Sequence, residues 1–409
     1  MHRIINCLSA RLAKAQASAI VAFLGFVLVI SNTACRRTET PVDKGNRLQI
    51  LHKGNGKEVQ DLDPHIVNGV SSFNVLAELF EGLVAEDPHD LHPVPGVAER
   101  WEISPDEKAY IFHLRRDARW SNGEPVSARD FVDSYHRVLS PAMASDVAYM
   151  LYPVANAEAF NTGKITDFSQ VGFRQIDDWT LEITLASPTP YFLSLLSHYS
   201  WFPVHLPTIR KYGPAFARGS RWTRPGRLIG NGPFNLEEWR LNDRIRVQKS
   251  ATYWDAKTVS LNAIVFHTID SNDVEERAFR SGQLHVTDSI PVNRIDRYRR
   301  EHPELLRIDP YLGTYFFRAN VTRPVLNNRL VRRALAMSID RKAIVENVWR
   351  GGQLPAGCFT PPNTAGYTCE SFIPYDPNGA RKLLAEAGYP EGRGLPAIEI
   401  LFKAPRTTS

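Results

Sequence analysis

The sequence predicts a mixed α/β protein with more than one domain. Its 409 residues are more than one ordinary hydrophobic core accommodates. Apolar residues alternate over residues 110–114, as in a half-buried strand, and recur at helical spacing over residues 131–138. The hydrophobic fraction of 43% and the charged fraction of 23% are typical of a soluble globular protein.

The start of the chain, residues 1–34, is typical of a secretory signal. Basic residues precede an apolar run, residues 19–30, which is shorter than the ~20 residues of a comfortable membrane span. Small and polar residues then lead to Cys35, an order that resembles a bacterial lipoprotein signal with a lipidated cysteine. Asn32 stands where that motif prefers Leu, so simple cleavage and a retained anchor stay open. We expect a periplasmic or cell-surface location with a membrane anchor through Cys35. Residues 35–46 are polar, show no apolar periodicity and predict a flexible tether.

The remaining chain alternates strand-like and helix-like stretches. Ser127 and Asp130 have the spacing of a capping box, which predicts a helix start immediately before the apolar residues 131–138. Gly163 follows a helical stretch and predicts its end. Strands are expected at residues 48–51, 110–114 and 181–185, and helices at residues 72–83, 131–138, 155–162 and 380–387.

The charge distribution argues against nucleic acid as a partner. The formal net charge is +5, and the segment before Cys35 contributes three basic residues and no acid, so removing it leaves 5 − 3 = +2. The Arg-rich runs at residues 218–227 and 294–300 lack regularly interleaved aromatics for base stacking. We interpret them as solvated faces.

The sequence contains no pattern typical of a catalytic or metal site. A nucleophile elbow, a phosphate-binding loop and a paired-His metal helix are all missing, so no catalytic residue, cofactor or metal is expected. Cys358 and Cys369 follow the signal in an exported chain, which predicts a disulfide, with two buried free thiols as the alternative. Zinc is disfavoured because no His or second Cys pair lies nearby at ligand spacing.

One long run carries a family resemblance. Residues 111–131, IFHLRRDARWSNGEPVSARDF, resemble a stretch near the start of the second domain in the periplasmic oligopeptide-binding receptors of ABC importers. These receptors are extracellular solute-binding proteins of the dipeptide/oligopeptide/nickel class. Further matches are residues 58–65, 187–193, 229–234, 250–255, 278–285, 326–341 and 376–389. In the match that ends at His285, the family usually has Asp at that position.

The resemblance implies a periplasmic binding protein-like type II fold, with two lobes, a hinge and an extra domain. Domain I is expected to be split between residues 47–80 and 206–312, around domain II at residues 81–205. Domain III is expected at residues 313–409. Because the matches run to the last residue while family members continue, we expect a C-terminally truncated member.

The resemblance also implies a monomeric receptor, not an enzyme, that delivers oligopeptides to an ABC permease and its ATPases. The two lobes would close over a peptide by hinge motion and satisfy its backbone groups with strand-like hydrogen bonds. Dipeptides, murein peptides, nickel and haem stay open as ligands, and a periplasmic hydrolase is the remaining alternative. The family's carboxylate for the peptide ammonium is expected beyond Ser409.

Site residues are carried over from the resemblance position by position. The ligand-loop candidates are Asn68, Gly69, Val70 and Ser71. Tyr149 is the aromatic candidate, although another alignment register places Val147 there. Arg318 follows the crossover from domain I to domain III, and Trp349 lies where some relatives have a basic residue for longer peptides.

Overall fold

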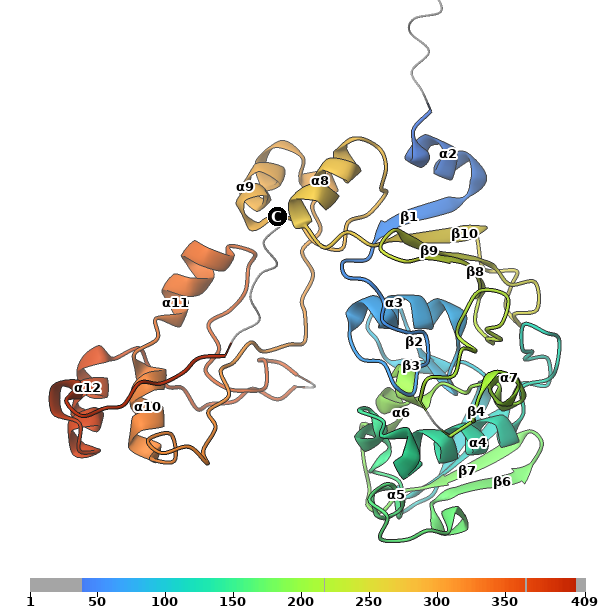
Figure 1. Ribbon diagram of the computed structural model, residues 1–409, viewed down its shortest axis with the longest axis horizontal. Coiled ribbons are helices and arrows are strands. Elements are labelled where there is room, and N and C mark those ends of the chain that lie inside the picture. Colours follow the sequence, from blue (N-terminus) through green and yellow to red (C-terminus); the bar gives the residue numbers. More distant parts are fainter. Residues whose placement is uncertain (1–38, 217, 365, 402–409) are drawn as a thin grey trace, which may run out of the picture. The chain divides into compact units, whose positions relative to one another are not determined.

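The computed structural model describes residues 39–216, 218–364 and 366–401, so the predicted signal and Cys35 lie outside the described residues. The chain forms two compact units (Figure 1). The first unit comprises Met1–Ile269 together with Ala278–Val286. The second unit comprises Asp270–Arg277 together with Thr287–Ser409.

A four-stranded mixed sheet in the first unit joins two stretches that are far apart in the sequence. Its strands, in spatial order, are β1 (Ile50–Gly54), β10 (Ala263–His267), β9 (Arg244–Lys249) and β8 (Phe234–Arg240). β1 runs parallel to β10, and the other neighbours are antiparallel. Residues 50–54 and strands within residues 234–267 therefore share one sheet.

A second, antiparallel sheet lies within the segment predicted as domain II. Its strands, in spatial order, are β4 (Ala98–Ile103), β5 (Ala109–Leu114), β7 (Thr180–Thr184) and β6 (Phe173–Asp177). The predicted alternation in β5 is confirmed, because Tyr110, Phe112 and Leu114 are buried while Ile111 and His113 are half-buried. Period-2 patterns of this kind place every second side chain in the core.

Helix α4 (Ala128–Leu139) covers this antiparallel sheet and begins at the predicted capping box. The backbone N–H of Ser127 donates to the Asp130 carboxylate at 2.7 Å. The helix then buries Phe131, Tyr135 and Val138, which lie three and four residues apart on one face. A local sequence signal was therefore sufficient for this element.

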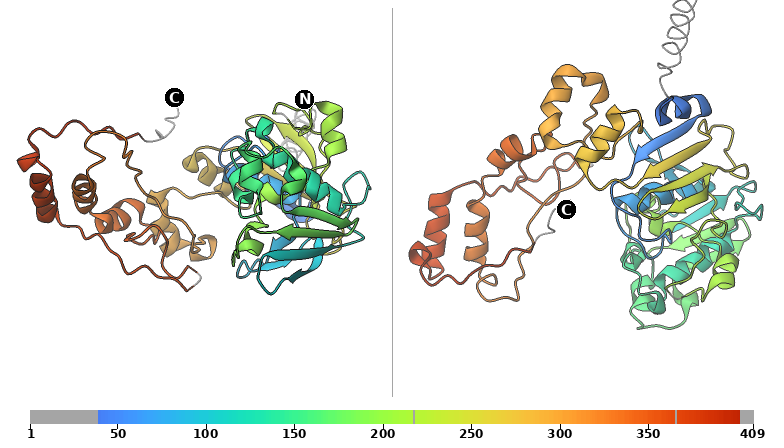
Figure 2. Two further views of the ribbon diagram at one scale, coloured as in Figure 1. Left: turned by 90° about the horizontal axis from the view of Figure 1, so that it is seen from below. Right: turned by 45° about the horizontal axis from the view of Figure 1, so that its top comes forward.

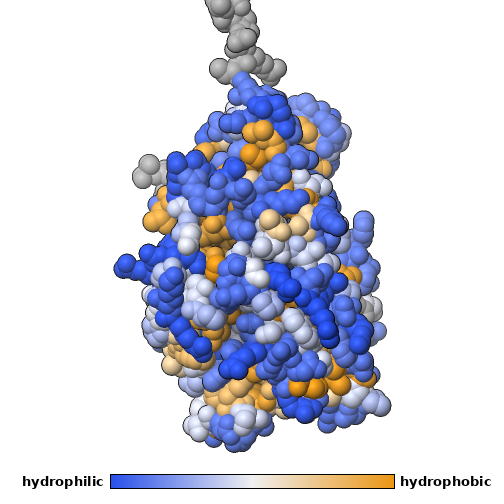
Figure 3. Space-filling model, turned by 90° about the vertical axis from the view of Figure 1, so that its right-hand side faces the viewer, coloured by the Kyte–Doolittle hydropathy of each residue, from blue (hydrophilic) through white to orange (hydrophobic). Residues whose placement is uncertain are grey.

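The other elements of the first unit are short. They are α2 (Pro41–Leu48), α3 (Val70–Leu79), α5 (Ala157–Asn161), α6 (Phe192–Leu195), α7 (Leu206–Tyr212), the hairpin β2 (Val84–Glu86) and β3 (Pro93–Pro95), and single 3₁₀ turns at Pro141–Met143, Ala148–Leu151, Phe168–Gln170 and Tyr199–Trp201. On the face drawn in Figure 3, hydrophilic side chains predominate and hydrophobic ones lie in separate small patches.

Helix α2 corrects the prediction of a flexible tether over residues 35–46, because the chain is helical from Pro41 onwards. The helix starts with a capping box in which the Asp43 N–H donates to the Thr40 hydroxyl at 3.1 Å. It is also fastened to the first unit, since the N–H of Val42 donates to the carbonyl of Gly282 at 2.9 Å. A polar helix of eight residues gains its stability from such contacts rather than from an apolar stripe.

The second unit contains mainly helices. They are α9 (Val292–Glu301), α10 (Arg329–Met337), α11 (Arg341–Ile344), α12 (Pro377–Glu386), a π-helical turn at Val345–Trp349 and 3₁₀ turns at Pro303–Leu305 and Pro390–Gly392. Helix α8 (Asn272–Arg280) begins in the second unit and ends in the first. α10 packs on α12 through the small cluster of Ala334, Met337 and Ala380.

The limits of the compact units differ from the predicted domains. Residues 287–312, which the sequence assigns to domain I, belong to the second unit. The physical reason is that α9 contacts α8 there, where the Tyr298 hydroxyl donates to Glu276 at 3.0 Å. The predicted domains I and II also fall into one unit, and the three-domain division stays a prediction.

Candidate ligand-binding site

The predicted ligand loop is the exposed N-terminal end of helix α3. Asn68 and Gly69 precede the helix, whereas Val70 and Ser71 are its first residues, which corrects the loop prediction at these two positions. Gly69, the N-cap residue, has a φ of 107°, a conformation that favours glycine, and it provides no side-chain cap. The helix start carried no capping signal, which explains why the sequence reads as a loop.

This helix end leaves backbone N–H groups available to a ligand. The first turn of an α-helix contains donors without intrahelical partners, and the helix dipole favours negative charge near them. Val70 is 61% exposed, so the turn faces solvent in the first unit. The chemistry available here is therefore main-chain hydrogen bonding to an acceptor.

Two buried or half-buried amides fix the first turn of α3. The side chain of Asn55 donates to the carbonyl of Ser71 at 3.0 Å, and the side chain of Asn74 donates to Asn55 at 3.0 Å. Asn55 follows β1, so the mixed sheet and the first turn of α3 are connected through side-chain hydrogen bonds. No sequence motif predicts this connection.

Tyr199 is a further residue at this site that the sequence did not indicate. It is buried, packs against Phe73 of α3 with ring centroids 6.0 Å apart, and its hydroxyl accepts a hydrogen bond from the backbone of Gly69. Burial, together with the neighbouring Tyr149, raises the pKa of Tyr199. The predicted residues Gly69 and Tyr149 thus both lie beside the same phenol ring.

The structure distinguishes between the two alignment registers for the aromatic candidate. Tyr149 is 60% exposed, whereas Val147 is only 4% exposed and belongs to the hydrophobic core. Of these two residues, Tyr149 is therefore the one whose side chain is accessible to a ligand.

A buried anchor network consists of Asp63, His65, Arg137 and Trp222, and its first two residues lie shortly before α3 in the chain. The guanidinium of Arg137 donates to both carboxylate oxygens of Asp63, at 2.9 and 2.6 Å, and to Nδ1 of His65 at 2.9 Å. The indole N–H of Trp222 also donates to Asp63, at 3.3 Å. Arg137 is fully buried on α4, so the network ties the segment before Asn68 to the antiparallel sheet's helix.

The electrostatics of the anchor network are those of a fixed ion pair. Burial alone would raise the pKa of Asp63, but the charge and hydrogen bonds of Arg137 outweigh burial and lower it. Burial and the adjacent Arg137 lower the pKa of His65 to about 4. His65 is therefore neutral near neutral pH; its Nδ1 accepts from Arg137 and its Nε2 donates to the carbonyl of Phe202 at 3.1 Å.

The remaining candidates belong to the second unit. Arg318 is exposed on an extended stretch, and Trp349 is 44% exposed at the end of the π-helical turn. The next residue, Arg350, forms an ion pair with Asp296 of α9. The structure therefore groups Gly69 and Tyr149 in one place, while a ligand role for Arg318 and Trp349 stays a prediction.

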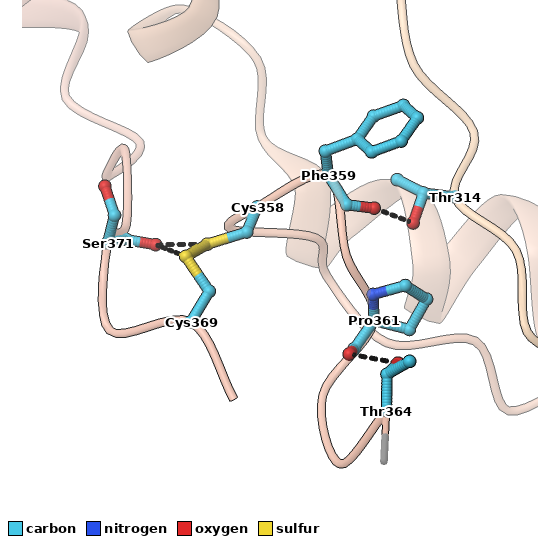
Figure 4. Close-up of a disulfide and its surroundings, with 7 residues drawn as sticks. All are labelled: Thr314, Cys358, Phe359, Pro361, Thr364, Cys369 and Ser371. Atoms are coloured by element: carbon cyan, nitrogen blue, oxygen red, sulfur yellow. Dashed lines mark hydrogen bonds between the residues drawn. A yellow bond between two sulfur atoms is a disulfide. The ribbon is translucent and has the colours of Figure 1, made fainter. Parts of the chain in front are cut away.

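Cys358 and Cys369 form the disulfide that the sequence predicts (Figure 4). The Sγ atom of Cys358 lies 2.9 Å from the carbonyl oxygen of Ser371. Nearby, the hydroxyl of Thr314 donates to the carbonyl of Phe359 at 2.6 Å. The disulfide thus closes a loop that contacts the extended stretch before Arg318.

In residues 39–216, 218–364 and 366–401, one group, formed by Asp87, Asp90 and His92, has ligand atoms close enough to hold a metal ion. All its atoms lie in one exposed turn, where Asp90 already accepts from His92 at 2.5 Å. Within the same part of the chain, none of the helices is long and apolar enough to cross a membrane.

Comparisons with known proteins give relatives over most of the chain. A profile of bacterial extracellular solute-binding proteins, family 5 middle, matches residues 92–408. The chain is 41% identical over 366 residues to the periplasmic oligopeptide-binding protein OppA of Escherichia coli, covering 87% of this chain. It is 38% identical over 389 residues to OppA of Salmonella typhimurium, covering 92% of this chain and 70% of that protein.

Solved structures agree with these relatives. The murein tripeptide binding protein MppA of Escherichia coli superposes with a TM-score of 0.77 at 34% identity, covering 83% of this chain and 67% of that chain. Haemophilus influenzae OppA in complex with the peptide RPPGFSPFR gives a TM-score of 0.75 at 34% identity, with the same coverage of 83% and 67%. The fold is therefore the mixed α/β fold of the periplasmic oligopeptide- and murein peptide-binding proteins.

The chain spans 65% of the length of the Escherichia coli relative, slightly less than two thirds. The match to the family nevertheless includes most of both compact units. The described fold, the mixed sheet shared by two distant segments and the signature of residues 111–131 agree with that match. The chain belongs to the bacterial extracellular solute-binding proteins of family 5.

Proposed function

We propose that the protein is an extracytoplasmic receptor that binds oligopeptides and delivers them to an ABC transporter permease and its ATPases. The observation that supports the proposal is the exposed N-terminal end of α3, where the side chain of Asn55 holds the first turn and its backbone donors in place. Its relatives include periplasmic oligopeptide-binding proteins of several bacteria, one of them solved with a bound nonapeptide.

The chemistry of this turn suits a peptide ligand. A buried peptide must have its main-chain polar groups satisfied, and the N–H groups of Val70 and Ser71, in the first turn of α3, can donate to its carbonyls. The exposed ring of Tyr149 provides an apolar surface for whichever side chain passes it. Recognition through the main chain, with water filling the side-chain spaces, gives broad specificity.

Calorimetric titration of the purified chain with tripeptides tests the proposal directly. We expect binding heat with mixed tripeptides, and chromatography of the same samples should recover the peptides uncut. Cleavage of the peptides that is lost on changing one side chain would instead support the hydrolase alternative.

A matched pair of tyrosines sharpens the test. Tyr149→Ala is expected to weaken peptide binding about tenfold, the equivalent of about 1.4 kcal/mol for the loss of one large contact. Tyr191 is 62% exposed, close to the 60% of Tyr149, but lies apart from the ligand candidates. The Tyr191→Ala variant is therefore expected to bind peptides as tightly as the parent. Equal affinities of the two variants would remove Tyr149 from the site.

The choice among ligands is made in the same titration. The chain is 36% identical over 342 residues to the periplasmic murein peptide-binding protein MppA of Escherichia coli, so a murein tripeptide is included. Dipeptides, Ni²⁺ and haem complete the set. Saturable binding of oligopeptides with weaker binding of the others supports the proposal, and a preference for Ni²⁺ or haem contradicts it.

We further propose that the mature protein is tethered to a membrane through a lipid on Cys35. The support is the order of basic residues, apolar run and small residues before Cys35. A Cys35→Ser variant is expected to move from the membrane fraction to the soluble extracytoplasmic fraction. Unchanged membrane association would favour a retained anchor.

A further inference from the structure

One stretch of the first unit concentrates positive charge. Residues 210–227 contain six basic residues and no acid: Arg210, Lys211, Arg218, Arg221, Arg224 and Arg227. The chain from Cys35 onwards has a formal net charge of +2, so outside this stretch its charges sum to 2 − 6 = −4. The rest of that part of the chain is therefore acidic, and one short stretch reverses the sign.

Four of these residues, Lys211, Arg221, Arg224 and Arg227, lie together and form a basic patch. Lys211, at the end of α7, and Arg227 both lie over the ring of Tyr212, 5.6 and 4.8 Å from its centroid. The guanidinium of Arg227 donates to the carbonyl of Arg221 at 3.4 Å, and its backbone N–H donates to the carbonyl of Arg224 at 3.0 Å. These contacts bring the two ends of the stretch to one place.

The basic patch is at the surface, beside β8. Lys211, Arg221 and Arg224 are exposed, and Arg227 is half-buried. The guanidinium of Arg224 lies 4.4 Å from the ring centroid of Trp239, a residue of β8. Figures 1 and 2 show α7 and the chain before β8 on the outer side of the first unit. Contacts with aromatic rings hold the cations in place without neutralising them.

The basic patch lacks counter-charges. Among the described residues, no carboxylate lies within ion-pair distance of its four side chains. The neighbouring Arg218 differs, because it pairs with Asp146 at 3.5 Å and donates to the carbonyl of Met143 at 2.9 Å. Like charges that share one ring, as Lys211 and Arg227 do, repel each other. An anion at the patch would relieve this repulsion.

We propose that the basic patch binds an anionic lipid surface, so that the protein rests on a membrane with this face. The partner follows from charge complementarity, because negatively charged headgroups attract the patch and repel the acidic remainder of the chain. This division of charge would orient the protein as well as hold it. The proposal goes beyond peptide binding and uses none of the ligand candidates. A lipid on Cys35 would keep the patch close to the membrane, but the attraction does not require it.

Nucleic acid fits the basic patch less well than a lipid surface. Binding of single strands relies on exposed aromatic rings that stack on bases. Here Tyr212 is covered by two cations of the patch, Trp222 is buried, and Trp239 lies against a guanidinium. The aromatic rings nearest the cations are therefore occupied. The remaining occupant, an acidic face of another protein, requires no lipid and is distinguished by vesicle binding.

The expected strength follows from the number of charges. Each basic residue close to an anionic bilayer strengthens binding about fivefold, so four residues together give about 600-fold. Salt weakens the attraction, because the Debye length falls from about 10 Å at 0.1 M to about 3 Å at 1 M. Binding by the patch should therefore require anionic lipid and should depend strongly on ionic strength.

Co-sedimentation with lipid vesicles tests the proposal. The full chain carries Cys35→Ser, so that no lipid on the protein contributes, and it is mixed with vesicles of phosphatidylcholine alone or of phosphatidylcholine with phosphatidylglycerol. We expect binding to the vesicles that contain phosphatidylglycerol, and loss of this binding in about 1 M salt. Binding that is independent of the anionic lipid, or absent from both kinds of vesicle, overturns the proposal.

Matched variants in the same background assign the binding to the patch. Arg221→Gln with Arg224→Gln should weaken binding to the anionic vesicles about 25-fold, which is about fivefold for each charge. Arg323→Gln with Arg393→Gln removes the same net charge at exposed positions of the second unit and should bind like the parent. Equal losses in the two pairs would mean that net charge alone decides, and would overturn the role of the patch.

Two further pairs separate charge from fold and from shape. Lys211→Gln with Arg221→Gln leaves the contact with Trp239 intact, so a loss of about 25-fold is expected even if Arg224 supports the fold. Arg221→Lys with Arg224→Lys keeps both charges, and a lipid surface, which responds to charge, should bind this pair like the parent. A loss in the Lys pair as large as in the Gln pair, with the circular dichroism of the parent, would show recognition of guanidinium shape and contradict a membrane partner.

Discussion

Removing the charge of Asp63 should expose how strongly the buried anchor network holds the first unit together. In the parent, Arg137 is fully buried and both of its terminal nitrogens donate to Asp63, at 2.9 and 2.6 Å. Asp63→Asn keeps the size of the side chain but leaves the guanidinium without a counter-charge, and it places an amide N–H opposite one of the donors. Breaking a buried pair in this way costs about 3–5 kcal/mol.

Thermal unfolding followed by circular dichroism measures this cost. For a unit of this size, about 1 kcal/mol corresponds to a shift of roughly 2–4 °C, so the melting temperature of Asp63→Asn should fall by about 10 °C. Arg137→Met removes the buried charge as well. The double variant, Asp63→Asn with Arg137→Met, should therefore be more stable than the sum of the two single effects predicts, by about 2 kcal/mol or more.

Two results would refute this reasoning. One is a melting temperature of Asp63→Asn within about 2 °C of the parent, which would mean that the pair contributes no more than an exposed ion pair. The other is strict additivity in the double variant, because residues in one hydrogen-bonded network must be energetically coupled. Binding of peptides serves as a second readout, since Asp63 and His65 hold the segment that leads to the first turn of α3, the proposed ligand site.

Three further predictions concern stability. The pKa of His65 is lowered to about 4 in the folded chain, so the unfolded chain binds this proton more readily. About 3 kcal/mol of the free energy of unfolding should therefore be lost as the pH falls from 6.5 towards 4. Urea unfolding over this pH range measures the loss, and a stability that does not change with pH would contradict it. Replacing Cys358 and Cys369 together by Ser opens a loop of sequence separation 11, which gives the unfolded chain more conformational entropy. The free energy of unfolding of the second unit should fall by about 3 kcal/mol in urea. An unchanged urea midpoint would contradict this entropic explanation. Gly230→Ala would place a Cβ atom 2.1 Å from the carbonyl oxygen of Leu79. The free energy of unfolding, measured in urea, should therefore fall by about 1–3 kcal/mol. A stability equal to that of the parent would show that α3 can shift to make room.

Elements with a local signal were predictable from the sequence. The alternation of Tyr110, Phe112 and Leu114 placed β5, and the pair Ser127 and Asp130 placed the start of α4. In both cases the residues that decide the structure are neighbours in the chain, so the pattern alone contains the information.

Helix α2 shows how a readable signal can be missed. Thr40 and Asp43 have capping-box spacing, and Pro41 occupies the first helical position, which together predict a helix start. The polar composition outweighed this signal in favour of a tether. What stabilises the helix, its contact with Gly282 and His285, lies more than two hundred residues away and cannot be read from the local pattern.

The candidate site divides in the same way. Gly69 and Tyr149 were identified by resemblance, while Tyr199, which is close enough to both for them to influence its pKa, is brought there only by the fold. The pairing of Asp63 with Arg137, 74 residues apart, likewise requires the three-dimensional arrangement. The close approach of Gly230 to the carbonyl of Leu79 at the end of α3 is likewise set by the fold.

The most direct test of the central claim is a comparison of tripeptides that share a main chain and differ in every side chain. A receptor that grips the main chain should bind trialanine, trilysine and trileucine with dissociation constants within about tenfold of each other in calorimetric titration, because less than about 1.4 kcal/mol then depends on the side chains. The corresponding free amino acids should give no saturable heat. An affinity that follows one side chain and persists in its free amino acid would contradict the account.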